Sequence, residues 1–169
     1  MSLDAIPSGA QILIDANILV FARHGASGQC RRLLERCLRR EVSGLITLIT
    51  VAEYCHRRMM QEAQSRGLSG SNPAKALAQD PRLVRQLILY RREVEDLLAG
   101  ELHVATNEAA DFYRALDPQS AHGLLTNDSL NLAAGLRCGV SIVATADRQF
   151  DSVEGITVFR PDDLSWSVS

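Results

Sequence analysis

Five short apolar runs divide this chain, and segments with helical spacing separate most of them. The runs are rich in β-branched residues, which is typical of buried strands. They cover residues 11–14, 45–49, 102–105, 140–144 and 157–159. Apolar strands that alternate with helices predict an α/β fold, in which a central, mostly parallel β-sheet is flanked by helices on both faces.

The segments between these runs carry the expected helices. Apolar residues recur at helical spacing in residues 27–40, and the same reasoning predicts helices over 50–66, 107–116 and 127–138. Residues 74–99 also have a helical pattern, interrupted at Asp80, which suits the N-cap of a second helix that begins at Pro81. Gly-, Ser- and Asn-rich residues 68–73 predict a loop, and residues 117–119 predict a turn.

Length and cysteine content narrow the class of protein. A chain of 169 residues suits a single domain over 1–169. Within it, residues 67–100 are expected to form a helical arm for RNA, a partner subunit or an antitoxin, with a plain helical hairpin that covers the core as the alternative. The four cysteines form no CxxC pair, so we expect free and mostly buried thiols rather than a zinc site or a Cys/His nucleophile. No apolar run reaches about 18 residues, and the N-terminus does not resemble a secretory signal, so we expect a cytoplasmic protein without a membrane span.

The charged residues have an uneven distribution. The formal net charge is −2, yet 17 of the 18 basic residues are arginines, and many fall within residues 31–40, 57–58 and 82–92. Arginine suits phosphate because its planar guanidinium presents a fork of donors. Either a nucleic-acid surface or ordinary solvated helix faces would account for these clusters.

Four acids occupy positions that a parallel sheet would bring together. Asp15 directly follows the first strand and Asp147 follows the fourth after two residues. Glu53 is expected in the first turn of the helix that leaves the second strand, and Asp128 begins the helix that leads back to the fourth. Because ligands of open parallel sheets bind beyond the carboxyl ends of the strands, we expect one acidic pocket there. Asp128 can join it only if its helix starts at that edge.

Such a pocket has a definite chemistry. Neighbouring carboxylates repel one another, so ionising all of them is costly unless a cation is present. Their hard oxygen atoms suit Mg²⁺ or Mn²⁺, and a pair of such ions about 4 Å apart can activate water and stabilise the leaving oxygen of a phosphodiester. No nucleophilic side chain is then required.

Each acid also has a purely structural explanation. Asp15 could cap the helical turn around Asn17, and Glu53 could complete a capping box with Thr50. Asp128 could be an ordinary first-turn acid, and Asp147 a turn residue. The joint placement of the four acids favours a shared site over these separate roles.

Four motifs in this order resemble the PIN-domain family, and most closely its VapC-type toxin ribonucleases. The first is Ile-Leu-Ile-Asp-Ala-Asn at 12–17, and the second, at 47–54, ends in Ala-Glu-Tyr. The third, at 127–134, begins with Asn-Asp-Ser-Leu, and the fourth, at 143–150, contains Thr-Ala-Asp and ends in Phe. Together they span almost the whole chain, although Asn131 stands where the family more often has an apolar or small residue.

The resemblance implies a PIN-like three-layer fold and an endoribonuclease that uses Mg²⁺ (or Mn²⁺) to activate water. It assigns both the catalytic and the metal-binding roles to Asp15, Glu53, Asp128 and Asp147. It also makes Asn17 and Thr145 supporting residues and Asp151 a candidate fifth acid, for which a surface turn is the alternative. Toxin members further imply an RNA substrate, a cognate antitoxin of a type II toxin–antitoxin pair, and a homodimer.

Two other functions remain open. One is a non-catalytic PIN-like module that binds RNA or protein, although degenerate members should lose acids that this chain keeps. The other is a phosphatase with Asp15 as covalent nucleophile, but such families usually carry a second Asp two residues later, where this chain has Asn17. The motifs do not specify which RNA would be cut.

Overall fold

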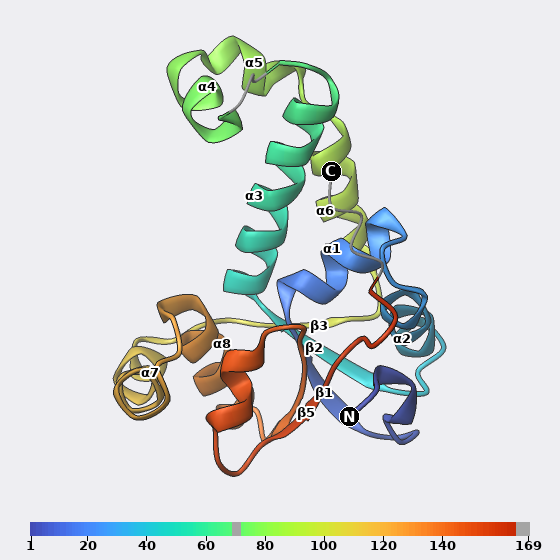
Figure 1. Ribbon diagram of the computed structural model, residues 1–169, viewed down its shortest axis with the longest axis vertical. Helices are drawn as coiled ribbons and strands as arrows, with labels where there is room; N and C mark the ends of the chain where they lie inside the picture. Colours follow the sequence, from blue (N-terminus) through green and yellow to red (C-terminus); the bar gives the residue numbers. More distant parts are fainter. Residues whose placement is uncertain (69–71, 165–169) are drawn as a thin grey trace.

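The computed structural model describes residues 1–68 and 72–164, and it contains a central sheet of five parallel strands (Figure 1). The strand order is β3-β2-β1-β4-β5, so β1 lies at the centre between β2 and β4. The strands are β1 (Gln11–Ile14), β2 (Ser43–Thr47), β3 (His103–Ala105), β4 (Ile142–Ala144) and β5 (Thr157–Phe159). The predicted parallel sheet is therefore confirmed, with β2 starting and ending two residues earlier than expected.

Eight α-helices and two short 3₁₀ helices surround the sheet in the described part of the chain. They are η1 (Leu3–Ala5), α1 (Ala16–His24), α2 (Gly28–Leu38), α3 (Leu48–Ser65), α4 (Pro73–Gln79), α5 (Pro81–Gln86), α6 (Leu89–Ala99), α7 (Ala109–His122), α8 (Thr126–Arg137) and η2 (Arg148–Ser152). None of these described helices is long and apolar enough to cross a membrane.

Alternation along β1 divides the core between the two faces of the sheet. Ile12 and Ile14 belong to the larger cluster, which includes buried residues of α1 and α2. Leu13 points to the opposite face, where it packs with Leu132 of α8 and with Phe150. The sheet thus lies between two helical layers, and the predicted three-layer α/β fold is confirmed.

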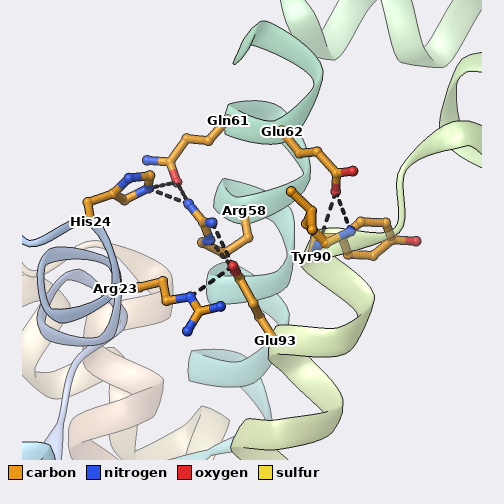
Figure 2. A network of polar contacts seen from close by, with 8 residues as sticks. Arg23, His24, Arg58, Gln61, Glu62, Tyr90 and Glu93 are labelled. Carbon is orange, nitrogen blue, oxygen red and sulfur yellow. Dashed lines mark hydrogen bonds and ion pairs between the residues drawn. The ribbon is translucent and has the colours of Figure 1, made fainter. Parts of the chain in front are cut away.

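A pair of helices extends away from the sheet. Helices α3 and α6 pack side by side, and α4 and α5 lie at the far end of α3 (Figure 1). A small cluster centred on Ala63, Leu77 and Leu87 joins these elements. Glu62, on α3, is almost fully buried and accepts hydrogen bonds from the backbone N–H groups of residues 88–90 at the start of α6 (Figure 2). This carboxylate satisfies donors that a helix N-terminus otherwise leaves unpaired.

One local prediction, and one alternative considered from the sequence, are wrong. Helix α7 continues through the expected turn at 117–119, with Pro118 inside it. Packing against α8 accounts for this, since Ala115 is buried and the Gln119 amide donates to the Ser129 hydroxyl at 2.8 Å. The N-cap of α3 is Thr47, whose hydroxyl accepts from the N–H of residue 50, so the alternative of a capping box between Thr50 and Glu53 does not apply.

The other local expectations have mixed outcomes. The predicted break before Pro81 is present, with the Asp80 carboxylate capping α5. All four cysteines are free: Cys30 and Cys37 are buried, Cys55 is half-buried and Cys138 is exposed. The middle of the loop expected at 68–73 lies outside the described residues, and its last residue already begins α4.

Candidate metal site

A pocket of about 430 Å³ lies at the carboxyl edge of the sheet. It is lined by Asp15, Asn17, Glu53, Arg57, Leu125, Thr126, Asn127, Asp128 and Asp147. The structure therefore brings together the four acids that the sequence placed at this edge, although they come from four separate segments of the chain. The sequence did not assign Arg57 or residues 125–127, which complete the lining, to this site, although Asn127 opens the third motif.

Asp15 is held by a network that joins the ends of β1 and β4. Asp15 is 9% exposed, and its carboxylate accepts hydrogen bonds from the Thr145 hydroxyl, at 2.6 Å, and from the Asn17 amide. The Asn17 amide oxygen in turn accepts from the N–H of Ala146 at 3.1 Å. Asn17 and Thr145 thus orient this carboxylate, and in the described structure the Asp15 side chain does not cap α1.

Asp147 enters the pocket from the segment after β4. Its N–H donates to the Thr145 hydroxyl at 3.0 Å, and its Oδ1 accepts from the N–H of Gln149 at 2.8 Å as the N-cap of η2. The turn role considered from the sequence is therefore real, and it coexists with a position in the pocket lining.

Helix α8 brings Asp128 to the same edge. Asp128 is its third residue, in the first turn as expected. The helix lies close to the sheet at Gly135, where an added Cβ would be 3.0 Å from Leu13 Cδ2. Asn131, the residue that departs from the family motif, is buried and accepts a hydrogen bond from the Thr47 hydroxyl. This unusual residue therefore ties α8 to the beginning of α3.

Glu53 reaches the pocket from α3, but from the second turn rather than the first. The difference arises because α3 begins at Leu48, two residues earlier than the sequence pattern predicts. One turn further on, Arg57 forms an ion pair with Glu53 at 2.6 Å. The spacing of four residues is the sequence signal that could have identified this partner.

Burial and neighbouring charges raise the pKa values of two of these acids, Asp128 and Asp15. Burial raises the pKa of Asp128 to about 7, with further contributions from the negative charges of Asp15, Asp147 and Glu53. Burial also raises the pKa of Asp15; the Thr145 hydrogen bond opposes this effect and the charge of Glu53 adds to it. The positive charge of Arg57 in the pocket lining therefore does not compensate all the negative charge of the four acids.

The donor set fits a hard divalent cation. Carboxylate oxygens are the ligands that Mg²⁺ and Mn²⁺ prefer. A cation among them would relieve the repulsion that, together with burial, raises the pKa values of Asp15 and Asp128. Asp15, Glu53, Asp128 and Asp147 are the side chains that could hold it. As they stand in residues 1–68 and 72–164, no three His, Cys, Asp or Glu side chains converge into a ready ligand group.

Asp151, the candidate fifth acid, is engaged elsewhere. Its carboxylate is exposed and forms an ion pair with Arg160 at 2.7 Å. Arg160 also donates to the backbone oxygen of Asp147 at 2.8 Å, so this arginine links η2 to the segment after β5. The geometry fits the surface alternative that the sequence left open for Asp151.

Comparisons with known proteins identify the fold. No family model matches the sequence, and no curated protein matches it. Among solved structures, VapBC2 from Rickettsia felis bound to a promoter DNA fragment has a TM-score of 0.59 at 13% identity, covering 90% of this chain and 99% of that chain. A toxin–antitoxin complex from Klebsiella pneumoniae has a TM-score of 0.58 at 16% identity, covering 86% and 95%.

DNA-bound VapBC from Salmonella typhimurium is similar to the same degree, with a TM-score of 0.57 at 15% identity over 89% of this chain and 98% of that chain. These matches extend over nearly the full length of each chain. The PIN-like fold expected from the sequence motifs is therefore confirmed.

Proposed function

We propose that this protein is an endoribonuclease that depends on Mg²⁺ or Mn²⁺ and acts in the cytoplasm as the toxin of a type II toxin–antitoxin pair. One observation carries the proposal: four acids from four segments line a single pocket, and Asp128 has a pKa of about 7 there. Clustered acids of strongly perturbed pKa are typical of functional sites, and PIN-type toxins share this fold.

The residues of the pocket have distinct roles in this proposal. Asp15, Glu53, Asp128 and Asp147 would hold the metal, which when bound supplies an activated water and neutralises charge on the phosphodiester. Thr145 and Asn17 keep the Asp15 carboxylate in position through hydrogen bonds at the ends of β1 and β4. Residues 126–128 present the N-terminus of α8 to the pocket, and its free N–H groups favour a phosphate.

The proposed partners follow from the structural neighbours. The similar solved structures include a toxin–antitoxin complex and two VapBC proteins with DNA. We therefore propose an antitoxin as protein partner, and a homodimer as the assembly. A neighbouring reading frame for a small protein with a DNA-binding N-terminal half is the expected genomic sign of that antitoxin.

The decisive experiment removes one charge from the pocket. Asp15→Asn keeps the shape of the side chain and an oxygen that can accept from Thr145, but it removes a metal-binding carboxylate. We expect cleavage of a structured RNA, measured with Mg²⁺ or Mn²⁺, to fall by about 100-fold or more, with an unchanged circular dichroism spectrum. Asp117→Asn, an exposed acid on α7, is the matched control and should cleave normally.

Two results would contradict the proposal. Full activity of Asp15→Asn would show that the pocket does not carry the chemistry. RNA binding by the wild-type protein without cleavage, whichever divalent ion is supplied, would favour the non-catalytic module instead.

A further inference from the structure

The end of the helical pair carries a charge opposite to that of the rest of the chain. We define the described residues 66–68 and 72–92 as the arm tip; it includes α4, α5 and the beginning of α6. It contains six basic residues and one acid, a formal charge of +5 in a chain of net charge −2, so the remaining 145 residues carry −7. The basic residues are Arg66, Lys75, Arg82, Arg85, Arg91 and Arg92.

All six of these side chains belong to exposed residues. Arg82 pairs with Asp80 at 2.9 Å, and Arg91 pairs with Glu95 at 2.8 Å, but exposed pairs of this kind hold their partners weakly. Lys75, Arg85 and Arg92 form no ion pair with any carboxylate in the described ranges. The arm tip therefore presents positive charge to solvent from three successive helices.

Buried contacts fix the arm tip to the helix that carries Glu53. Glu62 accepts hydrogen bonds at 2.9–3.0 Å from the N–H groups of residues 88–90 in the arm tip (Figure 2). Just beyond the arm tip, Arg58 of α3 donates to Glu93 of α6 at 2.9 Å. From Glu53 the chain follows α3 for 12 residues to its end at Ser65, roughly 18 Å along the axis. The positive end and the acidic pocket are thus joined by one continuous helix.

We propose that the arm tip binds the phosphate backbone of the RNA strand whose other part lies in the acidic pocket. The choice of RNA as ligand rests on the proposed function. A pocket lined by four acids repels a polyanion, so an RNA ligand needs attraction from elsewhere on the protein. Exposed arginines supply it by releasing counterions from phosphates, and their guanidinium groups match phosphate oxygens. Several nucleotides would span the distance between the two regions.

The test compares two triple variants of equal charge, both in an Asp15→Asn background so that the RNA stays intact. The first is Lys75→Gln, Arg85→Gln and Arg92→Gln, in the arm tip. The control removes three other exposed arginines, by Arg31→Gln, Arg39→Gln and Arg114→Gln, all outside the arm tip. Binding of a labelled single-stranded RNA of about 20 nucleotides is measured by fluorescence anisotropy over a range of salt concentrations.

We expect the arm-tip variant to bind this RNA roughly 10- to 50-fold more weakly than its parent at physiological salt, because three phosphate contacts are lost. The slope of log affinity against log salt should decrease by about 2. A dinucleotide, too short to reach from the pocket to the arm tip, should show no difference. The control variant should change binding far less.

Equal losses in the two variants, or no loss in either, would overturn the inference. So would an arm-tip variant that keeps its RNA affinity but no longer binds polyglutamate, since that result points to an acidic protein partner. The proposed function fails separately: RNA bound through the arm tip but never cleaved by the wild-type protein would refute the ribonuclease and leave this inference intact.

Discussion

Buried acids occur both in the helical pair and in the pocket, and their surroundings are opposite. In the helical pair, burial would raise the pKa of Glu93, but hydrogen bonds and charge from Arg58 and Arg23 outweigh it and lower the pKa (Figure 2). Burial is likewise outweighed at Glu62, where backbone N–H groups of residues 88–90 lower the pKa. Each of these two acids is matched by donors that the protein itself provides.

The acids of the pocket are not matched in this way. The pKa of Asp15 is raised, and that of Asp128 is raised to about 7, first by burial and then by neighbouring carboxylates. Burial alone therefore does not separate a structural acid from a functional one. The distinction lies in whether the fold supplies the compensating donors or leaves them to a ligand.

The largest expected effect is on stability and concerns Glu93, an acid whose compensating donors the protein itself provides. Glu93→Ala leaves Arg58 buried without its carboxylate, and we expect the free energy of unfolding to fall by about 3 kcal/mol or more. Glu95→Ala, two residues further along the same helix, removes only the exposed partner of Arg91 and serves as the control. Urea denaturation measures both. If the two variants lost equal stability, the buried pair would not have the structural role assigned to it.

The contrast between these acids also separates what the sequence could predict from what it could not. Strand patterns located β1 and β5 at their observed bounds, and a rule for parallel sheets placed Asp15 and Asp147 at one edge. The Arg58–Glu93 pair joins residues 35 positions apart, and no local pattern signals it. The local sequence also does not predict that α7 continues through Pro118, because the favourable packing of α7 on α8 depends on tertiary structure.

The second prediction concerns Asp128, an acid of the pocket. The folded-state pKa of Asp128, about 7, exceeds its ordinary value of 3.8, so the fold favours the protonated form. The contribution of Asp128 to the free energy of unfolding of the wild type should therefore fall as the pH rises from about 4 to about 7. Asp128→Asn avoids this loss. We expect it to be about 2 kcal/mol more stable than the wild type above pH 7 without divalent ions, and equal to it near pH 4.

Urea denaturation at a series of pH values checks this prediction, with Asp117→Asn as an exposed control whose difference from wild type should not depend on pH. Added Mn²⁺ should reverse the order, because binding to the native state stabilises the wild type more than the variant. A wild-type protein more stable than Asp128→Asn throughout, in the absence of metal, would mean that Asp128 is a matched acid like Glu62.

The smallest effect should come from Arg57, the cation that the pocket does possess. It neutralises part of the charge on Glu53 through an ion pair at 2.6 Å. Arg57→Gln removes a positive charge from the pocket lining and releases this carboxylate. Both changes favour a divalent cation, so we expect Mn²⁺ affinity, measured by titration calorimetry, to rise about threefold to tenfold.

The control for the change in net charge is Arg39→Gln, at a residue that directly follows α2. Equal or weaker Mn²⁺ binding by Arg57→Gln would mean that Arg57 compensates Glu53 as Arg58 compensates Glu93. The proposed metal site would then lose Glu53, one of its four ligands.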